Sequence, residues 1–95
     1  MVVGVGSLEL YLPACHSLKE KRSVVRRVLD RVRNRFPVSA AEVDHQDLHQ
    51  RASLGFAVVS ADARVAESVL HKVEAFVVGL HLAEVIASDR EVIHL

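Results

Sequence analysis

Residue types that mark whole classes of protein are scarce in this chain of 95 residues. A single cysteine excludes a disulfide within the chain and is typical of proteins from the reducing cytosol. No apolar run approaches the length of a membrane span, and the N-terminal residues lack the basic start of a signal peptide. We therefore expect a cytoplasmic protein that has no membrane partner.

Aromatic side chains are also scarce, because the chain has three phenylalanines, one tyrosine and no tryptophan. Sheets that bind single-stranded RNA stack its bases on aromatic rings. The segment Gly55-Phe56-Ala57-Val58 faintly resembles the RNA-recognition-motif consensus, but Val58 and Ser60 stand where the other rings are needed. We expect no base stacking on a sheet face.

Apolar residues, in contrast, make up 51% of the chain, which is enough for a hydrophobic core. The length suits one domain over residues 1–95. A capping box, Ser17-Leu18-Lys19-Glu20, predicts a helix start at which the Ser17 hydroxyl accepts from the Glu20 amide and the Glu20 carboxylate accepts from the Ser17 amide. Pro37 ends this helix, because the residue before a proline avoids the helical region.

A second amphipathic helix follows in the other half of the chain. Its candidate caps are Ser60 and Asp62, and Gly79 is its expected stop. Strand-like segments surround the two helices, and Ala87-Ser88-Asp89-Arg90 interrupts the last of them, which indicates a bulge or two separate pieces. The predicted strands are Val2–Leu12, Val38–Val43, Leu54–Ser60 and a last one formed by Leu82–Ile86 and Glu91–Leu95.

The element order β-α-β-β-α-β predicts the α+β class and a ferredoxin-like split βαββαβ sandwich. Such a sandwich has a four-stranded antiparallel sheet with two helices on one face. The first and third strands are apolar on both sides, so Val3, Val5 and Val59 fall on the open face. Two readings stay open: an oligomer buries that face, or it is a modestly apolar exposed surface.

The formal net charge of zero hides an uneven distribution. Residues 17 to 36 hold eight basic and two acidic side chains, a net +6, whereas the rest of the chain holds four basic and ten acidic ones, a net −6. At 100° per residue, most of these cations fall in two rows on either side of the first helix. The candidate nucleic-acid-binding residues are Lys19, Arg22, Arg26 and Arg33, and secondarily Lys21, Arg27, Arg31 and Arg35.

Arginine is suited to bidentate contact with phosphate, so the helix is a candidate RNA-docking surface. The alternative is a solvated helix face that acidic neighbours such as Glu42 and Asp44 neutralise in the folded protein.

The polar loop Asp44–Arg51 overlaps a cluster of potential metal ligands. Imidazole and carboxylate suit zinc, nickel or manganese if the loop forms a helical turn, but loops also favour these residues for their own caps. We assign no metal or other cofactor. The cluster consists of Glu42, Asp44, His45, Asp47 and His49.

Cys15-His16 is the one candidate for nucleophilic catalysis, since it lies just before the N-terminus of a helix. Adjacent side chains seldom point at each other, and no third group is evident to orient the histidine. We expect no catalytic residues and no enzymatic activity.

The string Ser17-Leu18-Lys19-Glu20-Lys21-Arg22, which opens the basic helix after a short strand, resembles the YlxP-like family of bacterial proteins of unknown function, domain of unknown function 503. Further similarities are Glu42-Val43-Asp44, Gln46-Asp47-Leu48 and Leu54-Gly55-Phe56. The resemblance implies a ferredoxin-like fold. It also implies a role near RNA or the ribosome, because genes of this family commonly lie beside genes of translation initiation and ribosome maturation.

These patterns favour a non-enzymatic RNA- or ribosome-associated accessory factor that docks through its basic first helix. The alternative is a homo-oligomeric structural or small-ligand-binding module whose interface is the apolar sheet face.

Overall fold

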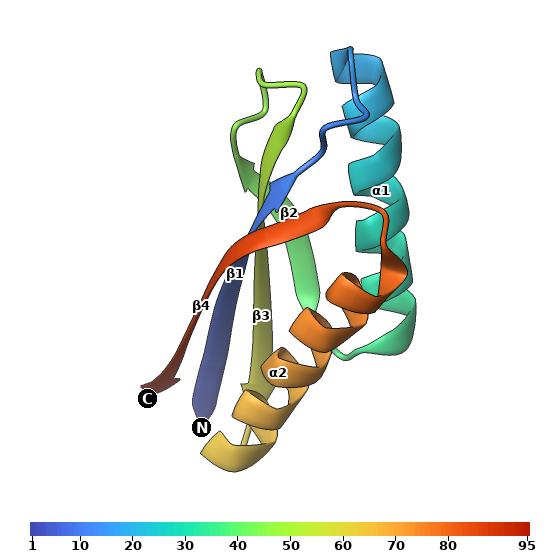
Figure 1. Cartoon of the computed structure of the whole chain (residues 1–95). Coiled ribbons are helices and arrows are strands. Elements are labelled where there is room, and N and C mark those ends of the chain that lie inside the picture. The colour runs from blue at the N-terminus through green and yellow to red at the C-terminus, as the bar shows by residue number, and fades with distance from the viewer.

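The computed structural model describes residues 1–95 and contains six elements in the predicted order (Figure 1). The strands form one antiparallel sheet in the order β2-β3-β1-β4, and both helices lie on one face of it. The predicted α+β ferredoxin-like βαββαβ fold is therefore confirmed. The elements are β1 (Val2–Tyr11), α1 (Leu18–Arg35), β2 (Ser39–Asp44), β3 (Arg51–Ser60), α2 (Ala63–Leu80) and β4 (Glu84–His94).

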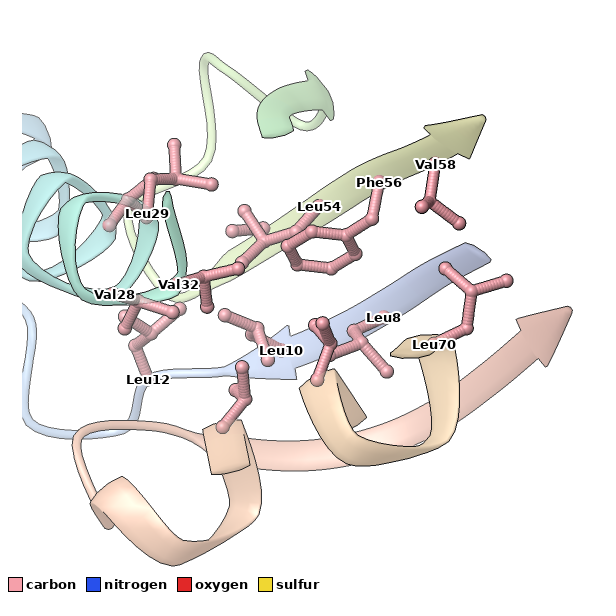
Figure 2. Packing of buried hydrophobic residues seen from close by; sticks show 14 of the residues in the cluster. Leu8, Leu10, Leu12, Val28, Leu29, Val32, Leu54, Phe56, Val58 and Leu70 are labelled. Carbon is pink, nitrogen blue, oxygen red and sulfur yellow. The ribbon is translucent and has the colours of Figure 1, made fainter. Parts of the chain in front are cut away.

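The core lies between the sheet and the helices, and the two-residue period of the strands builds it (Figure 2). In the register of β1 with β3, Leu8 pairs with Leu54 and Leu10 with Ala52, and all four side chains are buried. The alternate residues point to the opposite, open face. The labelled core residues of α1 and α2 that cover this layer are Val28, Leu29, Val32 and Leu70.

The last strand is one continuous strand with a bulge. Leu10 pairs with Val85 and Glu9 pairs with Ala87, so Ile86 is the extra residue. Of the two predicted alternatives, a bulge or two separate pieces, the bulge is confirmed. It lies at Ile86, one residue before the predicted segment Ala87-Ser88-Asp89-Arg90.

The third strand begins at Arg51, three residues earlier than predicted from its apolar run. Tyr11 pairs with Arg51 at the end of a ten-residue ladder between β1 and β3. Pairing with a long neighbouring strand extends β3 into a polar segment that local composition assigns to a loop. The loop between β2 and β3 is correspondingly shorter, at residues 45–50.

The start of α1 agrees with the capping box except in one bond. The Glu20 amide donates to the Ser17 hydroxyl at 3.1 Å, as predicted. The Glu20 carboxylate accepts from the amide of His16 at 2.7 Å rather than from that of Ser17. The box therefore also holds the loop that leads into the helix.

Asp62 is the cap of α2, because its carboxylate accepts from the Arg64 amide at 2.8 Å. The predicted stop at Gly79 is wrong: α2 continues to Leu80, and His81 takes the left-handed conformation with φ 53°. A histidine at the helix end thus supplies the turn that was expected from glycine. No helix of the structure combines the length and the apolar character needed to cross a membrane.

The close packing of α2 on the sheet leaves little room for a side chain at Gly4 in β1. A Cβ atom built on Gly4 would lie 3.1 Å from the side-chain carbons of Ala66 and Leu70 in α2. The second helix therefore sits directly on β1, and the first helix covers the other end of the sheet beside β2.

Candidate nucleic-acid interface

The outward face of α1 displays seven of the eight candidate cations. All seven are exposed, and they project from a helix whose opposite side is held in the core by Val25, Val28 and Val32. The buried side of the helix therefore fixes the positions from which the cations project. The exposed cations are Lys19, Arg22, Arg26, Arg27, Arg31, Arg33 and Arg35.

Lys21, the eighth candidate, is not a surface residue, and its assignment to the interface is wrong. Its side chain has no solvent-accessible surface, and its ammonium group donates to the Glu42 carboxylate at 2.8 Å. It also donates to the backbone carbonyls of His45 at 2.7 Å and Arg51 at 3.4 Å. A buried ammonium with these partners cannot reach a phosphate, and it instead joins α1 to both ends of the β2–β3 loop.

A signal for this buried lysine was present in the sequence. Lys21, Val25, Val28 and Val32 follow each other at helical spacing along one side of α1, so Lys21 belongs to the apolar stripe by position. The partner Glu42 is far away in the sequence, and no local pattern indicates that it comes within bonding distance.

Two further cations are engaged by the protein itself. The Arg33 guanidinium donates to the backbone carbonyl of Ala40 in β2 and lies 3.5 Å from the Asp30 carboxylate. The Arg35 guanidinium lies over the rings of Phe36 and Phe76, 5.9 Å and 5.2 Å from their centroids. Both remain exposed, but their positions are set by these contacts rather than by a ligand.

The remaining cations include four that border one open space on the outer surface of α1. This space has a volume of about 630 Å³ and no hydrophobic residue lines it, and we call it the cation hollow. No ion pair within the chain involves any of its four cations. The hollow is lined by Lys19, Arg22, Ser23, Arg26, Arg27 and Asp30.

Acidic side chains lie mostly away from the cation hollow. Glu42 does fold back against the helix, where it pairs with Lys21, but Asp44 accepts from the backbone amide of its neighbour His45. The register of the sheet places five carboxylates on the open face, on the side opposite α1. The two faces of the sandwich therefore carry opposite charge. The five are Glu9, Asp44, Glu84, Asp89 and Glu91.

The candidate metal ligands of the β2–β3 loop are not gathered into one site. The loop forms turns rather than a helical turn, and no group of three or more His, Cys, Asp or Glu side chains in the structure could hold a metal ion. His45 has a positive φ of 63°, and its Nε2 atom lies 3.7 Å from the Glu9 carboxylate. That carboxylate also accepts from the buried Ser53 hydroxyl at 2.6 Å.

Cys15 is buried, and desolvation raises the pKa of its thiol, with a smaller contribution from the Glu20 carboxylate. A raised pKa keeps the thiol protonated near neutral pH, whereas the thiolate is the reactive form. We expect Ellman's reagent to modify the folded protein at least about tenfold more slowly than the guanidinium-unfolded protein at pH 7.5. Equal rates in the two states would show a reactive thiol.

The open face of the sheet is apolar where the two chain ends meet. Val3 pairs with both Val59 and Ile93, and Val5 pairs with Ala57, so these side chains form a continuous patch on three strands. Val59 is 65% exposed. That a second copy of the chain covers this patch stays a prediction.

Known proteins resemble this chain over most of its length. The family described as "Protein of unknown function (DUF503)" matches residues 3–90. The "Uncharacterized protein YlxP" of Bacillus subtilis (strain 168) is 42% identical over 76 residues, which cover 80% of this chain and 83% of that protein.

Two solved structures are similar at 13% identity and a TM-score of 0.45. One is a mutant of SnoaB, a cofactor-independent oxygenase from Streptomyces nogalater, for which 99% of this chain and 91% of that chain are covered. The other is a REP-associated tyrosine transposase bound to a REP hairpin, for which 98% of this chain and 56% of that chain are covered. Similarity at this level carries no inference about activity.

Proposed function

The chain belongs to the DUF503 family of proteins of unknown function, and we propose that it is a non-enzymatic factor that docks on RNA, or on an RNA–protein assembly such as the ribosome, through α1. The observation that supports this most is the cation hollow. Lys19, Arg22, Arg26 and Arg27 lie together there and none of them forms an ion pair, because the one carboxylate that lines the hollow, that of Asp30, is paired with Arg33.

Like charges that share one space repel each other, and bound phosphate would remove that repulsion. Arginine stays protonated at physiological pH, so a surface of arginines binds anions and does not transfer protons. This chemistry favours docking rather than catalysis.

The separation of charge supports orientation as well as binding. Exposed cations lie on α1, and five carboxylates lie on the open sheet face on the other side of the molecule. A polyanion attracts the first surface and repels the second, so the protein would approach RNA with the helix leading.

Binding of ribosomal RNA by the full chain in a salt series tests the proposal. Each phosphate contact releases counterions, so the logarithm of the association constant should fall linearly with the logarithm of salt concentration, with a slope of about −3 for four contacts. Co-sedimentation with purified ribosomal subunits should weaken over the same salt range. No association with ribosomal RNA or with subunits at 50 mM salt would refute the proposed function.

A further inference from the structure

On the premise of the proposed function, we infer that α1 recognises the phosphate backbones of double-stranded RNA, across the two strands of the duplex, rather than single-stranded RNA or particular bases. Two features favour a duplex: the arrangement of the cations and the positions of the aromatic side chains. The unengaged cations, which make no ion pair, hydrogen bond or aromatic contact within the chain, are Lys19, Arg22, Arg26, Arg27 and Arg31.

The unengaged cations form two rows on opposite flanks of the exposed side of α1. At 100° per residue, the row of Lys19, Arg22 and Arg26 lies roughly 130° around the helix from the row of Arg27 and Arg31. On a helix about 10–12 Å wide with its side chains, charges at that angle are about 10 Å apart. A single phosphate backbone can follow one row, whereas two backbones are needed to occupy both.

The strip between the two rows disfavours a phosphate on the midline. Ser23, Asp30 and Asn34 occupy this strip, and the Asp30 carboxylate would repel an anion placed directly over it. Two lines of phosphate on the flanks avoid this carboxylate. A-form RNA presents such lines on either side of a major groove that is too deep and narrow for side chains to read.

No aromatic ring is placed to stack a base beside these cations. Phe56 is buried in the core, and the rings of Phe36 and Phe76 pack edge to face with centroids 5.5 Å apart. Tyr11 lies in β1 at a register position shared with the open-face residues, on the side of the sheet opposite the helices. Proteins that hold single-stranded nucleic acid derive much of their affinity from stacked bases, so α1 lacks what a single strand requires.

Titration of the full chain with three labelled 16-nucleotide RNAs at 100 mM salt tests the inference: a duplex, a duplex of shuffled sequence, and a single strand without self-complementarity. We expect the two duplexes to bind within about twofold of each other and about tenfold or more tightly than the single strand. A single strand that binds as tightly as the duplex, or a duplex preference lost on shuffling, would overturn the inference and leave the proposed function intact. No binding to any of the three overturns the inference, and association with ribosomal RNA or with subunits in the salt series then decides the proposed function by itself.

A double variant tests the contribution of one row. R27Q/R31Q removes one row, and we expect its duplex salt slope to become shallower by about two units while its affinity for the single strand changes by less than about threefold. If duplex and single-strand affinities fall by the same factor, the two rows do not bridge two strands. Thermal melting followed by circular dichroism checks that each variant is folded.

Discussion

Replacement of Lys21 by methionine is expected to destabilise the protein by about 3–5 kcal/mol, because it leaves the Glu42 carboxylate without its partner in a largely buried position. Two backbone carbonyls, those of His45 and Arg51, lose their donor at the same time. Urea unfolding of K21M and the wild type, followed by circular dichroism, measures the difference.

The matched control is K19M, which makes the same change two residues earlier at an exposed site without an ion pair. Its unfolding free energy should stay within about 0.5 kcal/mol of the wild type. The double variant K21M/E42Q removes the unpaired charge and should recover part of the loss. Equal stability of K21M and K19M would show that the Lys21–Glu42 pair does not hold α1 to the β2–β3 loop.

Reversal of three charges in the cation hollow, R22E/R26E/R27E, should lower the affinity for ribosomal RNA by roughly 100-fold at 100 mM salt, about 2.8 kcal/mol. Each lost phosphate contact also makes the salt slope shallower by about one unit. Arg33 is left unchanged, because its bond to the Ala40 carbonyl gives it a role in packing α1 against β2.

The control for this variant is R64E/K72E/R90E, which reverses three exposed cations outside α1. Both triple variants have the same formal net charge, −6, because each reversal changes the wild-type charge of zero by −2. A loss of RNA affinity confined to the α1 variant indicates a local site. Equal losses in both variants would mean that total charge alone governs the association, and the helix would have no special role.

The hexapeptide Ser17-Leu18-Lys19-Glu20-Lys21-Arg22 combines structural and surface residues. Ser17 and Glu20 cap the helix and hold the preceding loop, and Lys21 is buried in an ion pair. Lys19 and Arg22 are exposed and line the cation hollow. Much of this string is therefore explained by the folding of α1, and only Lys19 and Arg22 belong to the proposed RNA-docking surface.

The order of the elements, the fold class and the asymmetry of charge can all be predicted from the amino-acid sequence. These follow from local patterns, namely apolar periodicity, the capping box and a count of basic residues within one helix. Which cations remain free of partners, in contrast, depends on contacts between distant segments of the folded chain. Lys21 bonds to the Glu42 carboxylate, and Arg33 bonds to the Ala40 carbonyl. Both partners lie in β2, a strand that contacts α1 only in the folded chain.

The positions of the acidic residues likewise depend on the folded chain. A net charge of zero fits two arrangements. The carboxylates can lie next to α1 and neutralise its cations, or they can lie on the opposite face of the sheet and leave the cations unpaired. One carboxylate, that of Glu42, turns toward α1, while strand register sends Glu9, Asp89 and Glu91 to the other face. Such placement depends on the pairing of distant strands, in which a shift of one residue moves every side chain to the opposite face, so no local pattern contains it.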